Sequence, residues 1–253
     1  SYITQIGTGN YNEKTAGLYT DFCLMSANEE LGQNAAAFFS NMLIGNLEES
    51  YSRLLIAPYD MKKGLLRLID NEIAKGKNGR IIIKTNSITE RDLIDKLSEA
   101  SCAGVQIDLI VRGICCILPG IPEKTENIRV TSIVGRFLEH SRIYCFGKGE
   151  ARQIYISSAD IMTRNQQRRV EIAAPILSKE HKDWFSFYLD LILMDNVKAR
   201  ELTSLGTYVK KGKNGRDKIG VQQYYIDHPI QFAKSEIQKN GFLWRLERLL
   251  ARV

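Results

Sequence analysis

A histidine, an arginine and a group of small polar residues are spaced in the sequence so that they could act together on a phosphoryl group. His140 lies two residues before Arg142, and Ser157, Ser158 and Asp160 follow after a short interval. An imidazole can attack phosphorus, a guanidinium can balance the charge of phosphate oxygens, and hydroxyls can donate hydrogen bonds to the remaining oxygens. This set favours phosphoryl chemistry, although a strand-end histidine beside a solvated arginine gives the same pattern.

Two short strands must bring these side chains together. Apolar and polar residues alternate from Arg142 to Phe146 and again from Gln153 to Ser157, which predicts a pair of strands. Gly147 and Gly149 between them supply the positive φ angles that a tight hairpin needs. His140 therefore lies at the mouth of one strand, and the small hydroxyls lie at the end of the other.

The first part of the chain repeats this arrangement. Gln5-Ile-Gly-Thr-Gly-Asn10 can be laid on Tyr155-Ile-Ser-Ser-Ala-Asp160 at a constant offset. Two further pairs then coincide without a gap, Lys14 with Arg164 and Asp21 with Glu171. Each unit consists of a histidine-x-cation element, a turn, a strand ending in small residues, a cation and an acid on the next strand. The histidine-x-cation element of the first unit would precede residue 1, so we expect a truncated chain.

This two-unit pattern resembles the phospholipase D superfamily, whose two half-sites each bring a histidine to one shared phosphoryl site. The resemblance implies an α/β protein with a phospholipase-D-like mixed sheet flanked by helices, and with the remnant of a preceding homologous domain. We expect residues 1–50 to be that remnant and residues 51–205 to be the second phospholipase-D-like domain. Residues 206–253 would be a basic linker and a helical tail, with an amphipathic helix over 232–253.

Strand and helix patterns alternate after residue 51, which favours a sheet with parallel members. The predicted strands cover 54–57, 80–84, 105–111 and 128–134, and the predicted helices cover 26–46, 61–74, 89–103 and 179–200. Arg112 follows the strand 105–111 directly. Because ligands of open α/β sheets bind beyond the carboxyl ends of strands, Arg112 is a candidate phosphate ligand, with a surface ion pair as the alternative.

Composition narrows the class of partner without choosing one. The chain has 253 residues, 44% of them hydrophobic, and a formal net charge of +6. This excess favours polyanions, and Arg164, Arg168 and Arg169 would form a cationic wall beside the site. Five cysteines without paired spacing favour buried, reduced thiols. No apolar run has the length of a membrane span, so we predict a cytoplasmic protein and leave peripheral membrane association open.

Five ordered blocks resemble the C-terminal half of the long, phospholipase-D-like polyphosphate kinase family. The resemblance extends from residue 1 to about residue 215. The blocks are Gly7-Thr-Gly-Asn-Tyr-Asn-Glu-Lys-Thr-Ala16, Leu18-Tyr-Thr-Asp21, Leu109-Ile-Val-Arg-Gly-Ile-Cys-Cys116, Gly135-Arg-Phe-Leu-Glu-His-Ser-Arg-Ile-Tyr144 and Tyr155-Ile-Ser-Ser-Ala-Asp160.

The family resemblance implies reversible transfer of the ATP γ-phosphate to inorganic polyphosphate through a phosphohistidine, with Mg²⁺ accompanying ATP. The phosphorylated histidine would lie upstream of this chain, so we expect the fragment alone to be inactive. Carried over by motif, Tyr19, Arg112 and His140 would contact ATP, and His140 would assist the transfer. The family often has a histidine where this chain has Gln5.

The remaining implications concern phosphate contacts and partners. We expect ATP, ADP and polyphosphate as partners, a homo-oligomer in the full-length protein, no nucleic acid, and no metal-ligating side chains. The candidate phosphate or polyphosphate ligands are Asn10, Lys14, Arg142, Ser157, Ser158, Arg164 and Arg168.

Two other functions fit parts of the sequence. A phosphodiesterase or nuclease of the phospholipase D type would act without ATP, but it would have lysine where Arg142 stands. A non-catalytic module that binds polyanions would show salt-sensitive binding and no phosphate chemistry.

Overall fold

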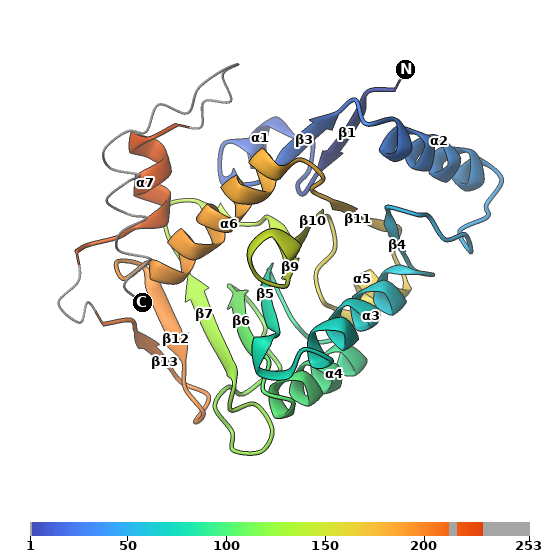
Figure 1. Ribbon diagram of the computed structural model, residues 1–253. Helices are drawn as coiled ribbons and strands as arrows, with labels where there is room; N and C mark the ends of the chain where they lie inside the picture. Colours follow the sequence, from blue (N-terminus) through green and yellow to red (C-terminus); the bar gives the residue numbers. More distant parts are fainter. Residues whose placement is uncertain (1, 213–216, 230–253) are drawn as a thin grey trace. The chain divides into compact units, whose positions relative to one another are not determined.

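The structure, a computed structural model, describes residues 2–212 and 217–229 (Figure 1). The chain forms two compact units, Ser1–Gln222 and Gln223–Val253. In the second unit, the described residues include most of helix α7 (Val221–Asp227), where Gln223 donates a hydrogen bond to Asp227. The predicted helix over 232–253 lies outside the described residues, as does part of the basic run that begins at Lys210.

A nine-stranded mixed sheet forms the centre of the first unit, with the strand order β13-β12-β7-β6-β5-β9-β10-β11-β4. Its middle strands, β5 (Arg80–Thr85), β6 (Gln106–Val111) and β7 (Ile128–Ile133), are parallel. The antiparallel strands around them are β9 (Arg142–Phe146), β10 (Gln153–Ser157), β11 (Glu171–Pro175), β4 (Leu55–Ala57), β12 (Ala199–Leu202) and β13 (Tyr208–Lys210). The predicted mixed sheet is confirmed.

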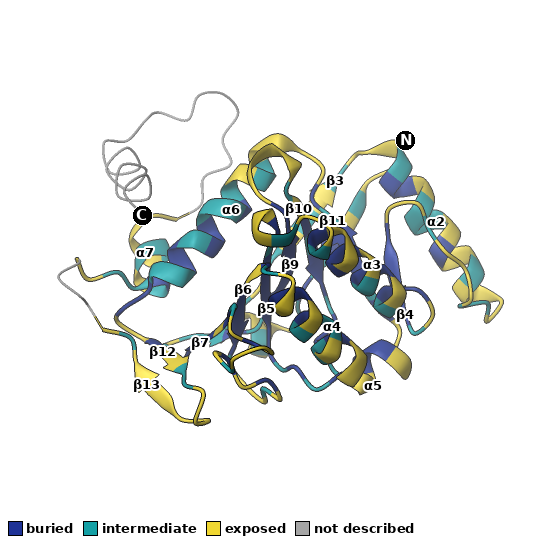
Figure 2. Cartoon of the chain, turned by 60° about the horizontal axis from the view of Figure 1, so that its bottom comes forward, coloured by how far each residue is buried: buried dark blue, intermediate teal, exposed yellow. Residues whose placement is uncertain are grey.

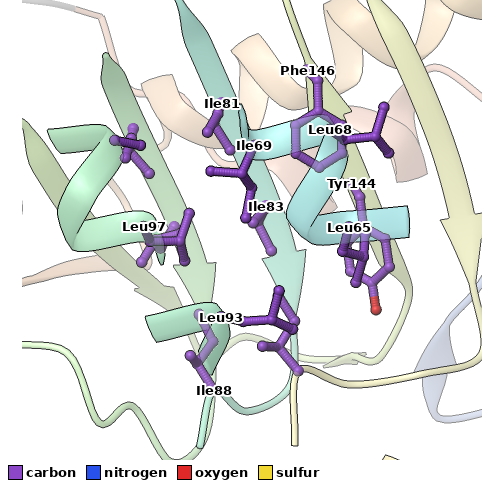
Figure 3. Close-up of a cluster of buried hydrophobic side chains, with 14 of the residues drawn as sticks. Leu65, Leu68, Ile69, Ile81, Ile83, Ile88, Leu93, Leu97, Tyr144 and Phe146 are labelled. Carbon is purple, nitrogen blue, oxygen red and sulfur yellow. The ribbon is translucent and has the colours of Figure 1, made fainter. Parts of the chain in front are cut away.

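Helices cover both faces of the sheet, as Figure 1 shows. Helices α3 (Met61–Ile73) and α4 (Arg91–Cys102) lie on one face, and α6 (Lys179–Met194) lies on the other. Successive side chains of a strand point to opposite faces, so Ile81 and Ile83 of β5 pack under α3 and α4 (Figure 3). The central strands β5, β6 and β9 are buried, edge strand β13 is exposed, and the outer faces of the helices are exposed (Figure 2). The predicted flanking of the sheet by helices is therefore confirmed.

The repeat seen in the sequence is also a repeat in strand pairing. Strand β1 (Thr4–Gly7) pairs with β3 (Cys23–Ser26) so that Gln5 faces Met25. Strand β10 pairs with β11 so that Tyr155 faces Pro175, at the same offset. Short helices occupy equivalent places between the paired strands, α1 (Glu13–Ala16) and α5 (Thr163–Gln167). The strand–helix–strand arrangement of residues 4–26 therefore matches that of residues 153–175.

Two of the predicted helices have wrong boundaries. The helix predicted over 26–46 is α2 (Glu29–Leu43), which begins after Asn28, because the Asn28 side chain accepts from the Leu31 amide at 2.9 Å. The helix predicted over 179–200 ends at Met194. There the Asp195 carboxylate accepts hydrogen bonds from the amides of 197, 198 and 199, which turns the chain into β12.

The prediction that the cysteines are buried holds only for Cys145. Cys115 is half-buried, and Cys23, Cys102 and Cys116 are exposed. Burial in the sheet raises the pKa of Cys145 to about 12, so its thiol stays protonated. In the described part of the chain, no helix is both long enough and apolar enough to span a membrane.

Ile83 tests the core between the sheet and helices α3 and α4. Its side chain is 1% exposed, so Ile83→Ala leaves a cavity and should lower the free energy of unfolding by about 2–5 kcal/mol. Ile114→Ala is the matched control, because Ile114 is 60% exposed and should change stability by less than about 0.5 kcal/mol. Urea denaturation measures both variants, and equal losses would contradict this placement of the core.

Candidate active site

Four of the residues singled out in the sequence, Arg112, His140, Arg142 and Asp160, meet at one edge of the sheet. Asn86 follows the carboxyl end of β5, and Arg112 follows the carboxyl end of β6. Strand β9 runs the opposite way, so His140 and Arg142 reach the same edge from its amino end. Asp160 arrives shortly after the end of β10. Pairing of separate strands therefore assembles side chains that are far apart in the sequence.

His140 is held by residues from both units of the repeat. Its Nδ1 lies 2.8 Å and 3.0 Å from the two carboxylate oxygens of Asp21. The Tyr19 ring lies against the imidazole, with 4.7 Å between ring centroids. The NH1 atom of Arg142 lies 3.2 Å from Nε2 and also donates to the Thr8 carbonyl at 2.9 Å. With a proton on Nδ1 facing Asp21, Nε2 is the nitrogen available for chemistry.

Asp21 is positioned by its neighbours in the first unit. The Thr8 hydroxyl donates to its Oδ1 atom at 2.7 Å. The next residue, Phe22, packs edge-on against Phe185 and Tyr188 of α6, with ring centroids 5.0 Å apart in each pair. These aromatic residues of α6 thus also anchor the segment before β3 that carries Asp21.

A short parallel pairing fixes Tyr19 beside the histidine. Strand β2 (Tyr19–Thr20) pairs with β8 (Leu138–Glu139), so Tyr19 faces Leu138 and Thr20 faces Glu139. The backbone amide of Ser141 also donates to the Thr20 carbonyl, at 2.9 Å. The two sequence-predicted residues Tyr19 and His140 therefore belong to one continuous pairing.

Arg142 and Asp160 form a buried ion pair with two hydrogen bonds. The Nε atom donates to Oδ1 at 3.1 Å and NH2 donates to Oδ2 at 3.0 Å. Burial alone raises the pKa of Asp160, but the hydrogen bonds and charge of Arg142 and the donors at Asn86 and Thr85 outweigh it and lower that pKa. Both side chains are therefore charged in the folded protein, and Arg142 is fixed in orientation.

A second buried ion pair, absent from the sequence predictions, lies beneath the histidine. Lys84 is 1% exposed, and its Nζ lies 3.2 Å from Glu139 Oε2 and donates to the Ser141 hydroxyl at 2.8 Å. Burial lowers the pKa of Lys84, and the charge of Glu139 opposes that shift. Glu139 also accepts from Thr20 at 3.1 Å and from Gln222 at 2.7 Å. This pair therefore ties β5, β2 and β8 together around His140.

Glu171 stands in the second unit where Asp21 stands in the first. The Ser158 hydroxyl donates to Glu171, as the Thr8 hydroxyl donates to Asp21. Asn165 adds a hydrogen bond to Glu171 at 2.7 Å. An apolar groove of about 290 Å³ opens beside Glu171, with Gln5, Phe38 and Ile172 among its walls. The structure therefore holds a second carboxylate in the setting that presents Asp21 to a histidine.

The other predicted phosphate ligands lie in two settings. Ser157 is fully buried. Its hydroxyl donates to the Ile172 carbonyl and accepts from the Ala159 amide, so its hydrogen bonds are made inside the protein. The exposed candidates are Asn10, Lys14, Arg164 and Arg168. Gln5 donates to the Tyr11 hydroxyl at 3.1 Å. In the described ranges, no group of three or more His, Cys, Asp or Glu side chains could hold a metal ion.

Removing the carboxylate of Glu139 tests the buried pair with Lys84. Glu139→Gln leaves a buried ammonium without its counter-charge and should cost about 3–5 kcal/mol of unfolding free energy. Lys84→Met in the same chain removes that charge, so the double variant should recover part of the loss. Urea denaturation of the single and double variants measures this coupling, and additive losses would contradict a direct interaction.

Comparison with known proteins agrees with this geometry. Residues 54–222 match the family model described as polyphosphate kinase C-terminal domain 2, and residues 1–49 match polyphosphate kinase C-terminal domain 1. A polyphosphate kinase of Staphylococcus saprophyticus is 50% identical over 206 residues, which are 80% of this chain and 29% of that protein. One from Exiguobacterium sibiricum is 50% identical over 235 residues, 90% of this chain and 32% of that protein.

A solved structure gives the same result for the fold. The crystal structure of polyphosphate kinase from Porphyromonas gingivalis superimposes with a TM-score of 0.83 and 39% identity, over 89% of this chain and 35% of that one. The chain thus spans 29% and 32% of the length of the two curated relatives, in which it matches the C-terminal part. It belongs to the polyphosphate kinase family, of which it carries the two C-terminal domains.

Proposed function

We propose that this chain supplies half of a site that transfers the ATP γ-phosphate reversibly to inorganic polyphosphate through a phosphohistidine. One observation carries the proposal. Asp21 and Glu171 are equivalent carboxylates that each accept a hydrogen bond from a hydroxyl of their own unit, but His140 contacts only Asp21. By the symmetry of the repeat, Glu171 is the expected partner of a second histidine. That histidine belongs to the histidine-x-cation element expected upstream of residue 1.

The proposed reaction has two displacements at phosphorus. The upstream imidazole nitrogen attacks the γ-phosphorus, the bond from that phosphorus to the bridging oxygen breaks, and ADP leaves. A terminal oxygen of polyphosphate then attacks the phosphohistidine, which restores the imidazole and lengthens the polymer by one phosphate. Phosphoryl transfer depends mainly on positioning and charge stabilisation, which buried and fixed groups supply well.

His140, Tyr19 and Arg112 would contact ATP on the opposite side of the transferred group. Asp21 holds the Nδ1 edge of His140, so the Nε2 edge, which lies 3.2 Å from Arg142 NH1, is the one that would meet a phosphate oxygen. Arg112 is half-buried, and burial is the main cause that lowers its pKa. The guanidinium nevertheless stays charged, as arginine does in proteins. A charged donor of this kind strengthens phosphate binding.

The exposed cations would guide the polymer to the site. Lys14, Arg164 and Arg168 are exposed, and they attract polyphosphate by charge that salt can screen. We propose that Mg²⁺ enters as part of the substrate, bound to the ATP phosphates. A homo-oligomeric full-length protein in the cytoplasm, which does not bind nucleic acid, remains our expectation for the biological setting.

The first test asks where the phosphate is bound covalently. The chain is incubated with Mg²⁺ and ATP labelled on the γ-phosphate, and acid-labile phosphate on the protein is measured. We expect no label on this chain, and label on the upstream histidine of the full-length protein that contains this sequence. Label on His140 would contradict the proposed roles, since it would make His140 the nucleophile.

The second test removes the assisting imidazole. In the full-length protein, His140→Ala should lower polyphosphate synthesis by about 100-fold or more, because an acid–base group typically contributes that much. His181→Ala on helix α6 is the control and should keep synthesis near the unmodified rate. Synthesis is followed as ATP-dependent polymer formation, and normal synthesis by the His140→Ala protein would overturn the assignment.

A further inference from the structure

We propose that Asn86 is a positioning residue that sets the orientation of Arg112 toward ATP and ties it to the backbone of His140. This inference rests on the proposed function of the same site. Asn86 follows strand β5 directly, and its residue is 5% exposed. Within the described site, the Asn86 side chain alone makes hydrogen bonds to all three of Arg112, Asp160 and the His140 backbone.

The contact with Arg112 fixes the guanidinium. The Nε atom of Arg112 donates to Asn86 Oδ1 at 2.6 Å and to the Glu139 carbonyl at 3.1 Å. Both acceptors hold Nε, so they leave the two terminal nitrogens of the guanidinium to face a ligand. A planar guanidinium with both terminal nitrogens aligned can bind phosphate with two parallel hydrogen bonds. Asn86 therefore sets the direction in which the two terminal nitrogens of Arg112 point.

The contacts with Asp160 and His140 fix Asn86 itself. Its Nδ2 atom donates to Asp160 Oδ1 at 2.9 Å and to the His140 carbonyl at 3.3 Å. Its backbone amide donates to the same Asp160 oxygen at 2.8 Å. Because Asp160 also binds Arg142, the amide of Asn86 links the two arginines of the site through one carboxylate.

Few other residues can make this set of bonds. An amide of this length donates with one end and accepts with the other, as the positions of Asp160 and Arg112 require. Aspartate in this place would keep the acceptor for Arg112 but would set a carboxylate against Asp160. The backbone at Gly113 also lies close to that of Asn86, since a Cβ on Gly113 would lie 2.8 Å from the Asn86 backbone carbonyl oxygen. This crowding leaves Asn86 little freedom to move.

The test is a double-mutant cycle on ATP binding by the full-length protein that contains this sequence. Asn86→Ala should raise the Kd for Mg·ATP about tenfold, the effect of one hydrogen bond to a charged group. In a background of Arg112→Ala, the same substitution should change the Kd by less than about twofold, because it acts through Arg112. Isothermal titration calorimetry measures the four proteins, and thermal melting measures their stability.

A matched control separates positioning from general stability. Asn127 also uses its side-chain amide at a strand end, donating to the Ser101 carbonyl at 2.8 Å and accepting from Gln106 at 2.9 Å, away from the site. Asn127→Ala should lower the melting temperature and leave the Kd unchanged. An unchanged Kd in Asn86→Ala, or equal effects with and without Arg112, would overturn the inference alone. Absence of ATP binding to the unmodified protein would overturn the proposed function and this inference with it.

Discussion

The buried carboxylate of Asp160 is the interaction on which the arrangement of the site depends. It accepts hydrogen bonds from Arg142, from the side chain and backbone amide of Asn86, and from Thr85, so β5, β9 and the end of β10 meet at one charge. Burying such a charge is costly unless donors surround it. The strand ends must therefore stay in register for the carboxylate to stay satisfied, and that register places His140 over the site.

The repeat adds a constraint of symmetry. In each unit a hydroxyl just past the end of one strand, Thr8 or Ser158, donates to an acid near the start of the next strand, Asp21 or Glu171. The same hydroxyls also accept from the backbone amides of Phe22 and Ile172. Each acid is thus oriented by its own unit before any histidine approaches it. His140 completes this pair for Asp21, and under the proposed function a second, upstream histidine would do the same for Glu171.

The sequence predicted local features well and features that depend on strand pairing poorly. The bounds of β9 and β10 agree with prediction, because alternation and glycine turns are local signals. Lys84 was missed because its partner Glu139 reaches it only through the pairing of β5 with β9. Asn86 could have been found by the rule that selected Arg112, since both residues directly follow parallel strands.

The buried charges and the exposed charges of the site have different roles: the first hold side chains in place, and the second attract anions. The buried or half-buried cations Lys84, Arg112 and Arg142 are matched by the carboxylates of Glu139, Asp21 and Asp160. This inner set of three cations and three carboxylates carries no net charge, so it holds geometry more than it draws in anions. Under the proposed function, attraction of polyphosphate falls to the exposed cations near α1 and α5, where solvent can replace the polymer as it moves. Such a division suits a polymer that must bind, react and slide by one unit.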